Sequence, residues 1–162
     1  MELFLKYLTA FGMSLVPVLE LRGAIIYAHT QGLNPILSYI VCVIGNMLPV
    51  PFIILFIRPI FDWMKKKASW MRRLVERMEA KAHSKSEKIR KYEMLGLFLL
   101  VAIPLPGTGA WTGSLVAAML GMRLKHASPM IFIGVLTAGL IVTLMFFGIF
   151  SYILQYFGFN IA

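Results

Sequence analysis

A carboxylate and a guanidinium lie two positions apart within an apolar part of the chain. Glu20 and Arg22 follow an uncharged run over residues 7–19, and no Lys, Arg, Asp or Glu occurs again before Arg58. Ionisable side chains at membrane depth are costly and commonly functional. Glu20 could carry a proton, and Arg22 could hold an anionic group through two parallel hydrogen bonds. A structural alternative is that the two charges neutralise each other, or that Arg22 binds the carbonyls of a broken helix.

A second candidate motif is the segment from Pro104 to Gly109. Its two prolines remove backbone donors and its two glycines favour a turn, so helix should stop near Ile103 and restart near Ala110. A restarting helix directs amide donors and its positive dipole end at an anion, although a purely structural turn fits equally well. The candidate substrate-binding residues are Glu20, Arg22, Gly23, Asn46, Pro104, Pro106, Gly107, Thr108, Gly109, Trp111 and Thr112.

Composition indicates the solvent in which these residues lie. The 162 residues are 59% hydrophobic and 14% charged, about half the charged fraction of an ordinary globular chain. This excludes a soluble enzyme, a disulfide scaffold and a disordered tail, and it predicts an all-α integral membrane protein. Cys42 is the one cysteine, and no histidines have metal-ligand spacing. With no nucleophile–base pair either, we expect no enzyme, no metal site and no cofactor.

Two apolar stretches are long enough to cross the membrane as full spans, 35–57 and 129–152. Asn34-Pro35 and Ser128-Pro129 place a side-chain cap before a proline at the first helical position of each. Gly45 and Gly139 each follow ten residues after that proline and permit close helix packing. Asn46 is polar at depth, where hydrogen bonding between helices is its first interpretation and lining the transport pathway its second.

The remaining apolar stretches, 3–31 and 94–122, are interrupted in the middle. In the second stretch the halves 94–103 and 110–122 have about 10 and 13 residues, which reach only about halfway across the bilayer. In the first stretch a helix over 3–16 is interrupted at 17–23, and we expect it to continue from Ala24 to Gln31. We therefore expect two re-entrant hairpins with buried tips. Hairpin plus span then occurs twice, over 1–57 and 94–162, with Pro17 to Ala24 resembling Pro104 to Ala110. Because a span changes side and a hairpin does not, the two halves form an inverted repeat, as in secondary transporters.

The segment between the halves, 58–93, carries 12 Lys/Arg and 5 Asp/Glu. This excess of positive charge predicts a cytoplasmic location in a multi-pass plasma-membrane protein with both termini outside, and it is better explained by topology than by nucleic-acid binding. A 3-4 apolar pattern over 62–92 predicts a long amphipathic helix. Its apolar stripe could lie on membrane lipids, pack on a second copy or cover the protein's own cytoplasmic end.

Glu20–Ile25, Gly45-Asn46 and the run from Pro104 to Gly113 together resemble the small multidrug export protein family over nearly the whole chain. The two-hairpin plan is also similar to that of the DedA membrane proteins, a resemblance that implies translocation of undecaprenyl phosphate or another lipid. Acidic residues in the first hairpin and arginines in the second are functional in DedA proteins. Glu20 matches the acidic position, whereas no arginine lies between Lys91 and Gly121.

The preferred hypothesis is a transporter, expected to be a homodimer, that moves an amphipathic anionic substrate such as a polyprenyl-phosphate lipid. Glu20 would be the proton- or ion-coupling carboxyl, Arg22 the anion ligand, and the backbone of 108–111 a second anion clamp. The first alternative is a proton-coupled exporter of cationic drugs, in which Glu20 binds the cation. The second is a non-transporting scaffold that recruits partners through its basic segment.

Overall fold

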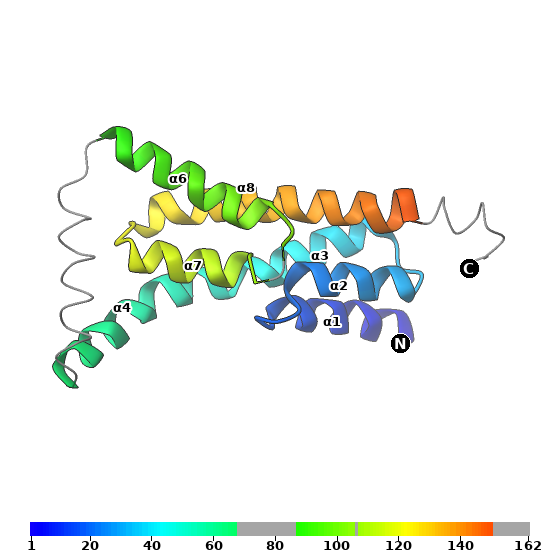
Figure 1. Cartoon of the computed structure of the whole chain (residues 1–162). Coiled ribbons are helices and arrows are strands. Elements are labelled where there is room, and N and C mark those ends of the chain that lie inside the picture. The colour runs from blue at the N-terminus through cyan, green and yellow to red at the C-terminus, as the bar shows by residue number, and fades with distance from the viewer. Residues whose placement is uncertain (68–86, 106, 151–162) are drawn as a thin grey trace.

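The computed structural model describes residues 1–67, 87–105 and 107–150, and within those ranges the chain forms helices and turns without a strand. Most of the expected amphipathic helix over 62–92, the end of the second expected span and Pro106 lie outside the described residues. With the labels of Figure 1, the helices are α1 (Glu2–Leu15), α2 (Glu20–Thr30), α3 (Pro35–Met47), α4 (Pro49–Lys67), α6 (Glu87–Ala102), α7 (Ala110–Met119), α8 (Leu124–Thr143) and the π-helix η1 (Leu144–Phe150).

Within the described residues, two helical stretches are long and apolar enough to cross a membrane. One is Pro35–Ile57, where α3 continues into α4, and the other is Leu124–Gly148, which combines α8 with part of η1. Their 23 and 25 residues correspond to more than the roughly 30 Å of a hydrocarbon core at about 1.5 Å per residue. The part of the chain that the structure describes is therefore helical and has two membrane-capable helices, in agreement with the prediction of an all-α membrane protein.

The first span begins as the sequence predicted. The Asn34 side-chain oxygen accepts from the amides of Ile36 at 3.0 Å and Leu37 at 3.1 Å, and Pro35 occupies the first helical position. The predicted span over 35–57 is nevertheless divided into α3 and α4 at Leu48. Since Pro49 and a second proline at 51 lack the N–H groups that would bond one turn back, the helical ladder is interrupted here.

The predicted start of the second span at Ser128-Pro129 is wrong, because α8 already begins at Leu124 and contains Pro129. Gly121 has φ +68° and ends α7: its amide donates to Ala118 O at 3.1 Å, and the amide of Met122 donates to Ala117 O at 2.9 Å. This glycine-terminated arrangement turns the chain within four residues, so the next helix starts earlier than the proline indicated. Gly32, with φ +64°, ends α2 by the same pair of bonds.

The predicted restart of the N-terminal hairpin at Ala24 is also wrong. Helix α2 begins at Glu20, whose φ of +49° makes it the non-glycine residue with positive φ among those described. Its amide donates to Val16 O at 2.9 Å, and the amide of Gly23 donates to Leu19 O at 2.9 Å. The chain thus reverses in one tight turn, which places both charged residues in the first turn of α2.

Glycines allow the helices to approach closely. An added Cβ on Gly45 of α3 would lie 2.9 Å from the Phe11 carbonyl oxygen of α1. One on Gly134 of α8 would lie 3.1 Å from the Phe98 carbonyl oxygen of α6, and one on Gly139 would lie 2.9 Å from Tyr39. Small residues at helix contacts are typical of membrane bundles, where backbones must pack without a hydrophobic driving force. The prediction of close packing at Gly45 and Gly139 is confirmed.

Helices α1 and α2 occupy one half of the long axis of the molecule, and α6 and α7 occupy the other half (Figure 1). The turn between α1 and α2 and the loop between α6 and α7 face each other in the middle. Helix α8 runs alongside both pairs and contacts α2, α3, α6 and α7. The start of α1 and the end of α8 lie at one end of the molecule, and the end of α4 and the start of α6 lie at the other. This arrangement brings the two candidate motifs together.

Candidate functional site

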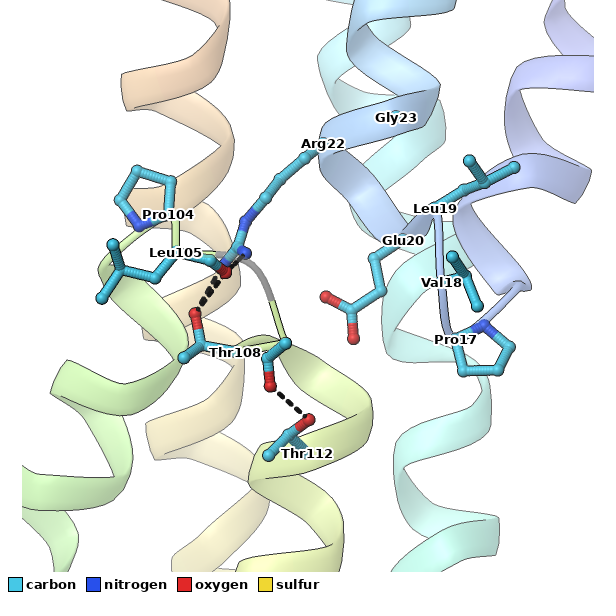
Figure 2. A pocket seen from close by; sticks show the side chains of 11 residues that line it. Pro17, Val18, Leu19, Glu20, Arg22, Gly23, Pro104, Leu105, Thr108 and Thr112 are labelled. Carbon is cyan, nitrogen blue, oxygen red and sulfur yellow. Dashed lines mark hydrogen bonds between the residues drawn. The ribbon is translucent and has the colours of Figure 1, made fainter.

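The first turn of α2 directs its two charged side chains at the loop between α6 and α7 (Figure 2). Glu20 is buried and Arg22 is half-buried. Among the described residues the two do not form an ion pair with each other, because each binds a different end of the broken α6–α7 backbone. One alternative in the sequence analysis was that Arg22 binds the carbonyls of a broken helix, and the structure shows this contact.

Arg22 binds the end of α6. Its Nη1 donates to the carbonyl oxygen of Leu105, and its Nη2 donates to that of Ile103 at 3.2 Å and to Oγ1 of Thr108 at 3.1 Å. The Thr108 hydroxyl lies 2.9 Å from the Ile103 oxygen and 2.8 Å from the Leu105 oxygen. Ile103 and Leu105 directly follow α6, whose carbonyl end carries the negative end of the helix dipole, and their oxygens also accept from the amides of Leu105 at 2.8 Å and Thr108 at 3.2 Å. A guanidinium from the other hairpin supplies further donors and a positive charge.

Glu20 binds the start of α7. Its Oε1 accepts from the amide of Trp111 at 3.3 Å. Gly109 occupies the N-cap position of α7 and offers no side chain, and an added Cβ there would overlap the Glu20 carboxyl group. Glu20 thus takes the place of the capping side chain, with its negative charge at the positive end of the helix dipole. Gly109 has φ +154° and ψ −164°, a region essentially restricted to glycine.

Trp111 makes the reverse connection from the second hairpin to the first. Its indole Nε1 donates to the carbonyl oxygen of Leu15, the last residue of α1, at 3.0 Å. The sequence predicted Trp111 as a binding residue but gave no signal of this contact, because its partner is a backbone atom. Three side chains, Glu20, Arg22 and Trp111, therefore hold the two tips together through backbone groups of the opposite hairpin.

A cavity of about 280 Å³ opens between the two tips (Figure 2). It is lined by Pro17, Val18, Leu19, Glu20, Arg22, Gly23, Pro104, Leu105, Gly107, Thr108 and Thr112. Seven of these were predicted from the sequence, and the residues that sequence reasoning missed are the α1–α2 turn residues 17–19 and Leu105. The signal for the turn was Pro17, which marked the break without indicating that its neighbours face the second hairpin.

The predicted site residues divide into three groups. Seven line the cavity, whereas Gly109 and Trp111 lie behind Glu20 as its binding partners. Asn46 on α3 lines a separate void of about 10 Å³, which it shares with Glu20, Arg22 and Gly109. Pro106 lies outside the described residues. Substrate binding by any of these residues stays a prediction. The two motifs that the sequence analysis selected, Glu20 with Arg22 and the segment 104–109, nevertheless lie next to each other in the fold.

A family model described as "Putative small multi-drug export protein" matches residues 20–141, from Glu20 through most of α8. No curated protein and no solved structure matches the chain. The matched region contains Glu20, Arg22, the 104–109 loop and every helix of the two hairpins except α1. Together with the two membrane-capable helices, this match over most of the chain shows that the protein is a membrane protein of the small multi-drug export family, a family of transporters.

Proposed function

We propose that the protein is a proton-coupled transporter in which the cavity between the hairpin tips receives the polar head of an amphipathic anionic substrate. A polyprenyl-phosphate lipid is the substrate we favour. The observation that carries the proposal is that Glu20 and Arg22 line one cavity where the two broken motifs meet. An acid and a guanidinium at the same cavity provide a proton carrier and an anion ligand side by side.

In the proposed membrane topology, α3–α4 and α8 are full spans, and the α1–α2 and α6–α7 pairs are re-entrant hairpins. Helices α1, α2 and α7 have 14, 11 and 10 residues, so each covers about 15–21 Å at 1.5 Å per residue. That is roughly half of a bilayer core. The contacts between the tips support a meeting point near the midplane, with the basic segment cytoplasmic and both termini outside.

Equivalent positions in the two halves support an inverted repeat, with a register different from the one that the prolines indicated. Arg22 and Trp111 each donate to the carbonyl end of the opposite hairpin's first helix, Gly32 and Gly121 each end the second helix, and Gly45 and Gly134 each contact the first helix. All three pairs are 89 positions apart (22 to 111, 32 to 121, 45 to 134). In this register Glu20 corresponds to Gly109, and both have positive φ.

The size and lining of the cavity favour a head group over a whole drug molecule. Its volume of about 280 Å³ is below the roughly 300–1,000 Å³ of pockets that enclose drug-sized ligands. Arg22, Thr108 and Thr112 carry donors suited to a phosphate, which would replace the backbone carbonyls that these donors now bind. Val18 and Leu105 are apolar, exposed and part of the same wall, so the chain of an amphiphile can lie against them in the lipid while only its head enters.

Coupling follows from the role of Glu20 as the cap of α7. An ionised carboxylate stabilises the positive end of the helix dipole, and a protonated one gives up most of that stabilisation. Proton binding therefore weakens the contact between α2 and α7 and favours separation of the tips. A substrate anion at Arg22 competes with the Ile103 and Leu105 carbonyls for the same donors, which loosens the second contact. Proton and substrate thereby act on the same interface between the hairpins.

The competing function is proton-coupled export of cationic compounds, which the family description and the carboxyl group in the cavity wall favour. In that case the cation binds Glu20, and Arg22 is only a structural cap. A dimer, in which a second copy completes the pathway, is compatible with both functions.

Proteoliposome transport separates the two functions. One set of vesicles follows transfer of a fluorescent short-chain polyprenyl phosphate between leaflets, and another follows ethidium efflux driven by a pH gradient. Arg22→Lys, Arg22→Gln and Glu20→Gln are compared with Arg123→Gln and Glu2→Gln, which change the same charges outside the cavity. We expect Arg22→Gln to abolish lipid transfer, with part of it retained by Arg22→Lys, and Glu20→Gln to remove its dependence on the gradient. Ethidium efflux that survives Arg22→Gln but not Glu20→Gln, in vesicles without lipid transfer, contradicts the anionic substrate.

A further inference from the structure

Asn46 is a buried polar residue that the proposed transport site does not use. It lies on α3 with 2% of its surface exposed, and its side-chain Oδ1 has no hydrogen-bond partner. A buried acceptor without a donor is strongly unfavourable, so such groups are normally satisfied by protein or by ordered water. The atom therefore indicates a ligand with an O–H or N–H group.

The void beside Asn46 has the size and lining for that ligand. Its volume is about 10 Å³, close to the space that one water molecule needs. Its polar lining comes from Asn46, Glu20 and Arg22, and its remaining wall is backbone or apolar side chain from α2, α6, α7 and α8. A buried water needs two to four polar partners. The residues that line the void can supply them, because Asn46 Oδ1 and the Glu20 carboxylate are acceptors and Arg22 carries N–H donors.

A monovalent cation fits this lining less well than water. Two residues with side-chain oxygens, Glu20 and Asn46, line the void, and the positively charged Arg22 lines it too. A metal cation in a protein needs several oxygen ligands, and the positive charge of a neighbouring guanidinium repels it. Water, which donates to two acceptors and accepts from one donor, uses all three polar groups.

We infer that this void is a binding site for a single water molecule that joins Asn46 to Glu20, and that Asn46 is a positioning residue that sets the pH at which Glu20 takes up a proton. The water donates one hydrogen to Asn46 Oδ1 and the other to the ionised carboxylate of Glu20, a residue that also lines the substrate cavity. Among the described residues that line either cavity, Arg22 is the other charged group facing Glu20. The second part of the inference rests on the proposed role of Glu20 as the coupling residue.

Asn46→Leu tests the site because it keeps the branched shape and the number of heavy atoms of the side chain and removes its acceptor. Without the acceptor the water loses a partner, and the ionised carboxylate loses a donor that stabilised it. The proton affinity of Glu20 then rises by about tenfold or more, so its titration midpoint moves up by about one pH unit. Ser38→Ala is the matched control. Ser38 is on the same helix, fully buried, and its hydroxyl also lacks a partner, but it lines neither cavity.

The measurement is a ¹³C NMR titration of the glutamate carboxyl carbons of the full chain in lipid nanodiscs, with the Glu20 signal assigned by its loss in Glu20→Gln. The expected result is an upward shift in Asn46→Leu and none in Ser38→Ala. Thermal unfolding of the same samples gives a second readout. If Asn46 Oδ1 simply lacked a partner, Asn46→Leu would raise the melting temperature markedly, whereas loss of a satisfied water site leaves it equal or lowers it.

An unchanged Glu20 midpoint in Asn46→Leu overturns the inference whether or not the vesicles transport, and so does a raised melting temperature. A midpoint that shifts in the presence of Na⁺ alone identifies the occupant as a cation and also overturns it. The outcome is separable from that of the proposed function: if the midpoint moves in Asn46→Leu while Glu20→Gln transports with unaltered gradient dependence, the water site stands and the coupling role of Glu20 fails.

Discussion

Replacing Gly109 with alanine tests whether the Glu20 carboxyl occupies the N-terminal end of α7. The new Cβ would overlap that carboxyl group, and the backbone would be held at φ +154°. The backbone strain costs about 1–3 kcal/mol. Displacing the carboxyl loses a charge-assisted hydrogen bond worth about 1.5–3 kcal/mol. We therefore expect the free energy of unfolding to fall by about 2.5–6 kcal/mol, the sum of the two costs.

Gly107→Ala is the matched control, because it lies in the same loop with φ +78° and an added Cβ would meet nothing within 4 Å. It carries only the backbone cost of about 1–3 kcal/mol. The assay is unfolding in mixed micelles of increasing SDS content, followed by tryptophan fluorescence. Repeating Gly109→Ala in a Glu20→Ala background removes the overlap and should reduce its cost to that of Gly107→Ala. Equal costs for the two glycines in the parent protein, or an undiminished cost in the Glu20→Ala background, would refute the placement of Glu20 as the cap of α7.

Three further predictions use the unfolding assay in mixed micelles or the lipid-transfer assay in proteoliposomes. Trp111→Phe removes the indole donor to Leu15 O and should lower the free energy of unfolding by about 0.6–1.5 kcal/mol; an unchanged value would mean that this contact does not hold the tips. Gly45→Ala should cost about 1–3 kcal/mol because its Cβ would crowd the Phe11 carbonyl, whereas Gly12→Ala on α1, with nothing within 4 Å, should be neutral or stabilising; similar values for both would contradict the close contact of α1 and α3. Thr112→Val removes a hydroxyl that lines the cavity and donates to Gly107 O at 2.9 Å, and it should raise the KM for the fluorescent polyprenyl phosphate severalfold. The control is Thr137→Val on α8, whose hydroxyl donates to Ile133 O and whose residue lines neither cavity. Equal effects of the two variants on KM would remove Thr112 from the site.

Some of the fold could be predicted because its signals are local. Asn34 followed by Pro35 identifies a helix start from adjacent residues, and the prolines and glycines of 104–109 identify a break from their own backbone restrictions. The same reasoning failed at Ser128-Pro129. There the helix start is set by the φ of Gly121, and proline is tolerated in the second turn of a helix that begins before it.

The site could be predicted in its membership but not in its contacts. Burial cost alone identified Glu20 and Arg22, since charges at depth must be satisfied. Their partners are the Ile103 and Leu105 carbonyls and the Trp111 amide, and backbone atoms carry no residue-type signal in the sequence. The reason for glycine at 109 was likewise hidden, because it depends on a carboxyl group from a helix 89 positions earlier.

Sidedness of the two hairpins is the most direct test of the transporter architecture. In a Cys42→Ser background, single cysteines at Thr30 and His126, both exposed, mark the far end of the first hairpin and the start of α8 beyond the second. Labelling of intact right-side-out vesicles with a membrane-impermeant maleimide should modify Thr30→Cys and leave His126→Cys unmodified until the vesicles are opened. Labelling of both positions from the same side would contradict entry of the hairpins from opposite faces of the membrane.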